Sequence, residues 1–185
     1  MTFVGHSLTG AAIAALCMPK KFRFSRKAET LAVFGILANL PDAPLPGWGH
    51  DRYVVSHSIF VNGLLIGMFI VILAFLKHLR RRIGGWRVIL GGAIAWFSHM
   101  LLDSFYNQGH GLQIYWPASD SRLNLPIPWF RVLPPEGMWN PAAFRIYFIE
   151  LIFYGLLLAT AVGIRWVFDR RFAAKDRSEL LLSQD

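Results

Sequence analysis

The segment Ile59–Leu76 is a run of 18 residues without a single charged side chain. An uncharged run of this length is typical of a helix that crosses a bilayer, whose hydrocarbon core is roughly 30 Å thick. The whole chain agrees, because its 185 residues are 55% hydrophobic and only 16% charged. Soluble domains carry about 25% charged residues, so the composition argues against a water-soluble enzyme and against a disordered chain. The sequence therefore predicts a membrane protein.

Four further apolar segments accompany this run. They are Phe3–Pro19, Thr30–Pro41, Val88–Leu102 and Ile146–Phe168. The first two are expected to be short or tilted helices, and the second of them to cover only part of the bilayer. We predict an all-α fold, a polytopic membrane helical bundle of about five membrane segments. A single membrane-embedded domain is expected over residues 1–168, with a polar cytoplasmic tail over 169–185.

The positions of the 19 lysine and arginine residues predict the orientation of the bundle. Fifteen of them lie in alternate connections, at 20–27, at 77–87 and from 165 to 177. Lys and Arg are retained on the cytoplasmic side, so the N-terminus and the loop 104–141 should face outside and the C-terminus should face the cytoplasm. The net charge of +8 then has a topological explanation, and no nucleic-acid partner is expected. The positive charges follow the first apolar segment, which argues against a cleaved signal peptide.

Ionisable side chains inside or beside membrane segments are costly and are usually functional. In this chain they gather at the predicted outer ends of the segments: His6, Asp42, His50, Asp51, His57, His99, Asp103 and His110. Five of the six histidines belong to this group, although the orientation was predicted from Lys and Arg alone. The sequence therefore predicts a functional site at the outer face.

His99 and Asp103 are four residues apart, so they lie about one turn apart on the same face of a helix. This spacing suits two ligands of one metal ion, or a histidine ligand with the carboxylate that orients it. Cys17 is the only cysteine, which excludes a thiol-rich site. Imidazole and carboxylate ligands favour Zn²⁺, Mn²⁺ or Fe²⁺.

Several of these polar residues also have simpler interpretations. Asp42 could cap a turn after Pro41, and His50 and His110 could be interfacial residues without a ligand role. Glu150, about one turn into the last segment, either joins the site or pairs with Arg145. The long loop 104–141, rich in Pro and Trp, is either a lid over the site or an interfacial anchor.

Five short motifs follow one another between residue 2 and about residue 130. They are T-F-V-G-H-S-L-T-G at 2–10, L-A-N-L-P-D at 37–42, S-H-S at 56–58, H-M-L-L-D at 99–103 and Y-W-P-A-S-D-S-R at 115–122. Their order and spacing resemble the YdjM-like family of bacterial inner-membrane proteins, which are described as LexA-regulated and as metal-dependent hydrolases.

The resemblance implies a multi-pass protein of the bacterial inner (plasma) membrane that binds a divalent metal ion, zinc first and manganese or iron as alternatives. The metal-site residues that it implies are His6, Asp42, His57, His99 and Asp103. The expected function is a membrane-bound hydrolase in which the metal activates a water at the outer face. His6, His57 and Asp103 are the expected catalytic residues. Arg52 and Arg122 are expected to bind an anionic group of a lipid or phosphoester substrate that enters from the bilayer.

Two other classes of function are compatible with the same residues. A non-enzymatic membrane protein could bind a metal or a partner through the long outer loop, without turnover. A small transporter or a haem-binding subunit would need two axial histidines that face one another, but the neighbouring carboxylates fit a hard-metal site better. The sequence leaves the substrate, the number of metal ions and the oligomeric state open.

Overall fold

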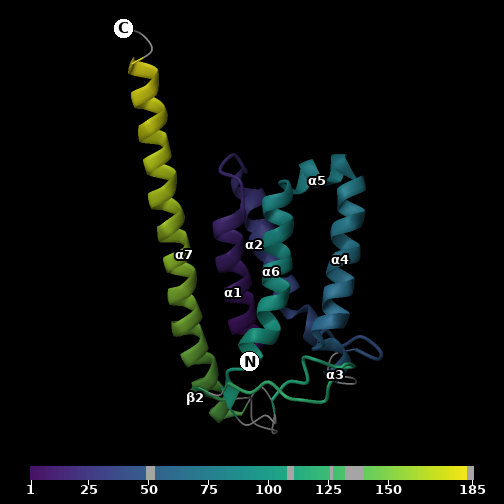
Figure 1. Cartoon of the computed structure of the whole chain (residues 1–185). Coiled ribbons are helices and arrows are strands. Elements are labelled where there is room, and N and C mark those ends of the chain that lie inside the picture. Colours follow the sequence, from purple (N-terminus) through teal and green to yellow (C-terminus); the bar gives the residue numbers. More distant parts are fainter. Residues whose placement is uncertain (49–52, 108–110, 126, 132–139, 183–185) are drawn as a thin grey trace.

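The computed structural model describes residues 1–48, 53–107, 111–125, 127–131 and 140–182. Its helices are α1 (Phe3–Cys17), α2 (Phe24–Asn39), the 3₁₀ helix η1 (Leu40–Asp42), α3 (Tyr53–Ser56), α4 (Ile59–Phe75), α5 (Lys77–Ile83), α6 (Trp86–Asp103) and α7 (Pro141–Leu182) (Figure 1). The strands β1 (Tyr106–Asn107) and β2 (Ile127–Arg131) pair in parallel. The prediction of an all-α fold is confirmed, and each predicted apolar segment coincides with one of the helices α1, α2, α4, α6 and α7.

One helical stretch in the described part of the chain, Pro141–Arg170 of α7, is long and apolar enough to cross a membrane by itself. Helices α4 and α5 reach the required length only together, and their axes differ by 107° at the break between them. Helix α1 is apolar but has only 15 residues. The number of spans and their orientation therefore stay predictions.

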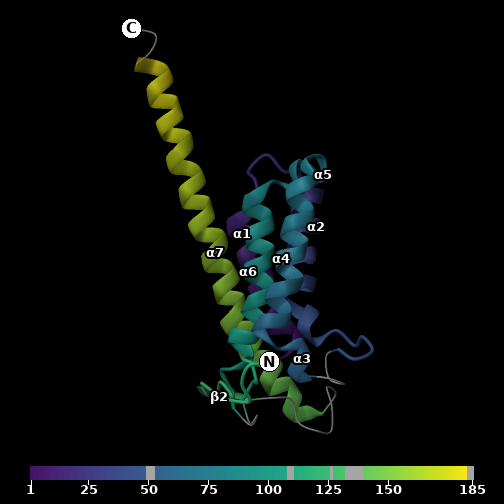
Figure 2. The same cartoon turned by 45° about the vertical axis from the view of Figure 1, so that its right-hand side comes forward.

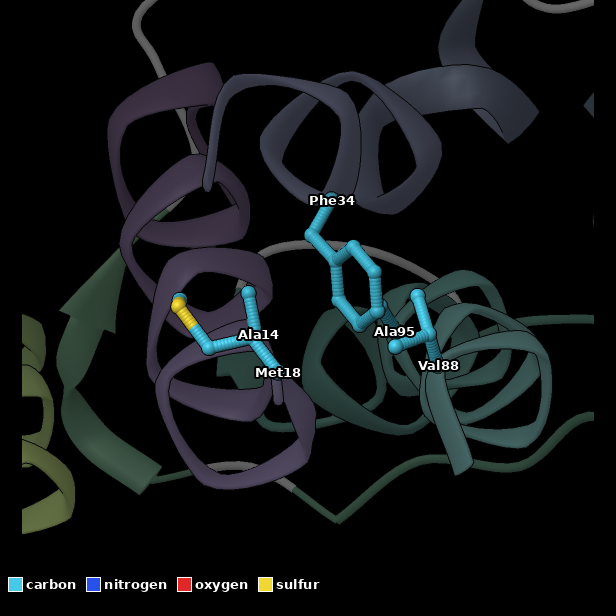
Figure 3. Packing of buried hydrophobic residues seen from close by; sticks show 5 residues of the cluster. All are labelled: Ala14, Met18, Phe34, Val88 and Ala95. Carbon is cyan, nitrogen blue, oxygen red and sulfur yellow. The ribbon is translucent and has the colours of Figure 1, made fainter. Parts of the chain in front are cut away.

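Helices α1, α2 and α6 pack against one another and form the core, and α7 lies along α1 (Figures 1 and 2). Phe34 of α2 fills the space between α1 and α6 (Figure 3). Its neighbours in this cluster are Ala14, Met18, Val88 and Ala95. Glycine lets α1 and α2 approach closely, because a Cβ atom at Gly10 would lie 2.3 Å from the carbonyl oxygen of Phe34. Such small-residue contacts are typical of helix packing in membranes.

The outward surfaces of α4 and α7 are covered with large apolar side chains. Phe69 and Phe75 of α4 are 62% and 82% exposed, and Phe148 and Leu156 of α7 are each 63% exposed. Continuous apolar surface of this kind is rare on proteins that face water, and it suits contact with lipid.

The two ends of the bundle differ in charge. The link between α1 and α2, helix α5 and the C-terminal part of α7 lie at one end, whereas the N-terminus, α3 and β2 lie at the other (Figure 1). The three Lys- and Arg-rich stretches therefore share one end, and the five predicted metal ligands lie at the opposite end. Helix α7 continues without a break from residue 168 to Leu182, so the predicted start of a tail at 169 stays a prediction.

Candidate metal centre

Four parts of the chain bring polar side chains to one point at the end of the bundle that holds the N-terminus. His6 lies in the first turn of α1, Asp42 ends η1, His57 follows α3, and His99 and Asp103 occupy the last turns of α6. The three histidine side chains are fully buried, Asp103 is 5% exposed and Asp42 is 26% exposed. The structure thus brings together all five residues that the sequence analysis named as metal ligands.

Four of these side chains direct one nitrogen or oxygen atom each at a common point. His57 Nε2 lies 3.1 Å from His99 Nε2. Asp42 Oδ1 lies 3.5 Å from His57 Nε2 and 3.6 Å from His99 Nε2. Asp103 Oδ2 lies 3.6 Å from His57 Nε2 and 3.3 Å from His99 Nε2. Ligand atoms 2.0–2.1 Å from a tetrahedral ion are roughly 3.3–3.4 Å apart, so all five distances fit one ion within a few tenths of an ångström.

Backbone carbonyl groups fix the tautomer of two of the histidines. His99 Nδ1 lies 2.7 Å from the carbonyl oxygen of Ala38, and His57 Nδ1 lies 3.0 Å from that of Tyr53. A carbonyl oxygen can only accept, so each Nδ1 donates its hydrogen and each neutral imidazole keeps a lone pair on Nε2. Two lone pairs 3.1 Å apart repel one another unless a cation lies between them. Histidine ligands of metal ions are commonly oriented by this kind of bond from their second nitrogen.

The buried atoms without a hydrogen-bond partner point to the same place. Within the described residues there are two such side-chain atoms, Asp42 Oδ1 and His6 Nδ1, and both belong to this cluster. A buried polar atom left unpaired costs about 1–3 kcal/mol, and more when the group is charged. Asp42 Oδ1 is also the atom that faces His57 and His99. A cation at the common point would satisfy this oxygen and both imidazole lone pairs at once.

Asp103 joins His6 to the rest of the cluster. His6 Nε2 lies 3.1 Å from Asp103 Oδ1, and the His6 ring stacks on the His99 ring with centroids 3.8 Å apart. The N-terminal amine of Met1 also donates to Asp103 Oδ1, at 2.7 Å. Ligand-capable atoms of His6, Asp42, His99 and Asp103 all lie within 4.8 Å of one another. His6 is therefore placed to be a further ligand or an acceptor of a proton beside the ion.

Tyr53 is a site residue that the sequence analysis missed. Its ring stacks on His57 with centroids 3.8 Å apart, and its hydroxyl donates to Asp103 Oδ2 at 3.4 Å. Burial, followed by the nearby carboxylates of Asp103 and Asp42, raises the pKa of Tyr53 well above its ordinary value, so the phenol stays protonated. Its spacing of four residues from His57 is the signal that could have found it.

Asn62 of α4 holds the turn that carries His57. Its Nδ2 donates to the carbonyl oxygens of Ser56 at 2.8 Å and Ser58 at 2.7 Å. Its Oδ1 accepts from the indole N–H of Trp96 in α6 at 2.6 Å. Asn62 is fully buried, so these bonds form inside the bundle and fix the position of the histidine relative to α6.

The long loop after α6 contacts the same turn. The hydroxyl of Ser58 donates to the carbonyl oxygen of Trp116, and the N–H of Ile59 donates to that of Ile114 at 2.8 Å. These bonds place part of the predicted outer loop next to the candidate metal centre. Whether the loop acts as a lid or only as an anchor stays a prediction.

Glu150 has a role that neither of its two predicted alternatives describes. It is fully buried, and its carboxylate accepts from the N–H groups of Thr2 at 3.0 Å and Gly5 at 3.1 Å, and from the hydroxyl of Thr2. These groups belong to the N-terminal end of α1, where free N–H groups and the helix dipole favour a negative charge. Glu150 therefore ties α7 to α1 next to His6, in place of metal binding or a bond to Arg145.

The remaining predicted site residues are outside the cluster or outside the described residues. Arg122 is exposed, and its guanidinium donates to the carbonyl oxygen of Gly111 at 3.3 Å. Arg52, His50 and His110 lie outside the residues that the structure describes. The proposed contacts of Arg52 and Arg122 with an anionic group stay predictions.

Comparisons with known proteins agree with the motifs. The model of the family described as YdjM inner membrane protein matches residues 1–171. Inner membrane protein YbcI of Escherichia coli (strain K12) is 28% identical over 137 residues, which cover 71% of this chain and 79% of that protein. No solved structure matches the chain.

Proposed function

Because the chain belongs to the YdjM inner membrane protein family, we propose that it is a membrane-bound, metal-dependent hydrolase with its site at the outer face. The family predicted from the motifs is confirmed over residues 1–171, and so is the location in the inner membrane. The hydrolytic activity, the identity of the ion and the side that the site faces form our proposal.

The proposal depends on one observation above all. Asp42 Oδ1 is buried without a hydrogen-bond donor, and it faces the Nε2 atoms of His57 and His99, which carry lone pairs when both imidazoles are neutral. A proton between the two nitrogens would relieve their repulsion but would leave this oxygen unpaired. A divalent ion held by Asp42, His57, His99 and Asp103 accounts for all four atoms. Two imidazoles and two carboxylates suit Zn²⁺, with Mn²⁺ or Fe²⁺ as alternatives.

The side chains around the ion suit hydrolysis of an ester. The chemistry that a bound zinc ion supplies is hydroxide near neutral pH, since the pKa of a bound water falls from 15.7 towards ~7. His6 donates from Nε2 to Asp103, which leaves the lone pair on its buried, unpaired Nδ1 as a proton acceptor in the site. Tyr53, kept protonated, would turn its one hydroxyl hydrogen from Asp103 Oδ2 to an oxygen on which negative charge develops. The proposed substrate is a lipid or a phosphoester that reaches the site from the bilayer.

The test is a measurement of metal content and activity on the purified protein. We expect about one zinc ion per chain by mass spectrometry of the metals. Release of phosphate from a phosphoester should stop when a chelator removes the ion and should return when zinc is added. Metal binding without turnover would favour the non-enzymatic alternative, and a protein without bound metal after incubation with zinc, manganese and iron salts would contradict the proposal.

The orientation can be tested by labelling of single cysteines. We expect 20–27 and 77–87 to be cytoplasmic and 104–141 to be outside, because 15 of the 19 Lys and Arg residues lie in alternate connections. In a Cys17→Ser background, Asp120→Cys should react with an impermeant maleimide on intact spheroplasts. Arg81→Cys should react only after the membrane is permeabilised. Both positions are exposed, so the reverse pattern of labelling would overturn the orientation.

Tyr53→Phe tests the hydrogen-bond donor in the site. We expect kcat for the phosphoester to fall about 10²–10³-fold, as when one donor to a developing oxyanion is removed. Zinc content should stay at the wild-type value, because the phenol is not among the proposed ligands. Tyr115→Phe, at an exposed tyrosine of the long loop, is the matched control and should keep its kcat. An unchanged kcat in Tyr53→Phe would remove this residue from the mechanism.

A further inference from the structure

A second concave feature lies beside the metal centre and takes no part in metal binding. It is a groove of about 590 Å³ between α2, α4 and α6. Apolar side chains form most of its walls, among them Val33, Leu37, Ile66, Phe69, Leu73 and Ala93. Polar groups lie at the end far from the metal centre, where Arg26 and Glu29 form an ion pair at 2.9 Å. The space exists because α4 makes only sparse contact with α6 and stands apart from α2.

The groove has the length of a lipid chain. Its lining residues on the α2 side run from Arg26 to Leu40. At 1.5 Å per residue this is about 21 Å. One leaflet of the bilayer contributes about half of a hydrocarbon core of ~30 Å, or ~15 Å. The groove is therefore long enough to hold a single alkyl chain along the whole length of that chain.

The near end of the groove lies next to the ligands of the metal centre. Leu40 precedes Asp42 by two residues, and Trp96 precedes His99 by three. Three residues of a helix span roughly 4.5 Å, so a group attached to a chain in the groove would need to extend only about one helical turn to reach the centre.

The chemistry of the walls decides which occupant fits. Water finds few hydrogen-bond partners along these apolar walls, because the indole N–H of Trp96 is already bonded to Asn62. An extended polypeptide would leave its backbone N–H and C=O groups unpaired there, which is strongly unfavourable in an apolar environment. A hydrocarbon chain has no polar group to satisfy, and the protein resides in a membrane where such chains surround it.

We propose that the groove binds one alkyl chain of a membrane phospholipid and so presents the phosphoester head of that lipid to the metal centre. This inference rests on the proposed hydrolase function and names its substrate class. The chain would enter sideways between α2 and α4, and the polar head would lie at the end of the bundle that holds the N-terminus.

Photo-crosslinking tests the groove without any turnover. The protein is reconstituted into vesicles of phosphatidylethanolamine and phosphatidylglycerol that contain a phosphatidic acid with a diazirine in one acyl chain. After irradiation, we expect adducts to be concentrated on peptides that line the groove, around Leu37 and Phe69. Ala93→Phe should reduce these adducts about tenfold, because extra bulk in this space costs about 1.4 kcal/mol or more. Ala159→Phe, on the exposed surface of α7, is the matched control and should leave them unchanged.

The outcomes separate the groove from the hydrolase. Adducts spread evenly over the exposed faces of α4 and α7 would overturn the proposed lipid groove, and so would equal amounts of adduct in Ala93→Phe and Ala159→Phe. Neither result would change the conclusion drawn from the zinc measurement. Groove adducts in a protein that binds no metal would retain the lipid site and overturn the hydrolase. A crosslink from the groove to another polypeptide would also contradict the proposal. Should Ala93→Phe fail to fold, Val33→Trp adds bulk at the half-exposed rim of the same groove.

Discussion

Asp103→Ala and His99→Ala are expected to abolish both zinc binding and phosphoester hydrolysis while the protein stays inserted in the membrane. Neither side chain is needed to span a bilayer, and both are costly to bury without the ion. For the wild type, zinc at a thousand times its Kd should stabilise the fold by about 4.1 kcal/mol. This corresponds to a rise in Tm of roughly 8–16 °C for a chain of about this size. Asp103→Ala and His99→Ala should show almost no rise in Tm when zinc is added.

Thermal melts in detergent with and without zinc measure this difference. His78→Ala is the matched control, because His78 is the histidine of α5 that lies exposed at the opposite end of the bundle. It should keep the full rise in Tm. Without zinc, His99→Ala should melt at or above the wild-type temperature, since the change removes a buried ionisable group that is costly to keep in the bundle without the ion. Equal rises with zinc in all proteins would mean that the cluster does not hold the ion.

Much of the helix arrangement could be predicted because membrane segments leave a strong signal in the sequence. The predicted segment Ile59–Leu76 coincides with α4 (Ile59–Phe75), and the predicted segment Val88–Leu102 lies inside α6. The start of α2 was missed by six residues, because its first turns carry charged residues such as Arg26 and Glu29 that interrupt the apolar run. Charged side chains are compatible with a helix that leaves the hydrocarbon region, so hydropathy alone cannot place such an end.

The cluster of candidate metal ligands could be predicted from the sequence for a related reason. His99 and Asp103 share a helix face by spacing alone, and ionisable groups stand out against apolar neighbours. The partners that orient them could not be predicted in this way. A backbone carbonyl group is present at every residue of every chain, so the one at Ala38 does not stand out in the sequence. Only the packing of η1 and α2 on α6 brings it to His99. Contacts between backbone and side chain across helices carry no sequence signal of their own.

Glu150 shows the same limit, and it also leads to a large expected effect on stability. Its carboxylate is the partner of three donors at the N-terminal end of α1, two N–H groups and one hydroxyl. Glu150→Ala would leave these donors buried and unpaired, at about 1–3 kcal/mol each, and would remove a favourable charge from the helix terminus. We expect the free energy of unfolding to fall by about 3–5 kcal/mol and Tm by roughly 8–15 °C.

Two further variants make this prediction specific. Glu150→Gln keeps one acceptor oxygen, so it should lose clearly less stability than Glu150→Ala. Arg145→Ala removes the exposed partner that the sequence alone suggested for Glu150, and it should change the free energy of unfolding by less than about 0.5 kcal/mol. Stability losses of equal size in Arg145→Ala and Glu150→Ala would contradict the bonds to α1.

The same carboxylate should also influence the metal centre from a distance. Gly5 directly precedes His6 in α1. The hydrogen bond from the Gly5 N–H to Glu150 therefore fixes the position of the helical turn that carries the His6 imidazole. His6 in turn bonds to Asp103, one of the proposed ligands. Loss of a group that orients a ligand commonly weakens metal binding 10–100-fold, and for Glu150→Ala, which acts on Asp103 through His6, we expect a loss at the lower end, about tenfold, in a zinc titration. Because Glu150 touches α1 and not the proposed ligands, zinc should still bind at saturation, with the same stoichiometry as in the wild type. A variant that is destabilised but binds zinc with unchanged affinity would show that α7 supports the fold alone, without positioning His6.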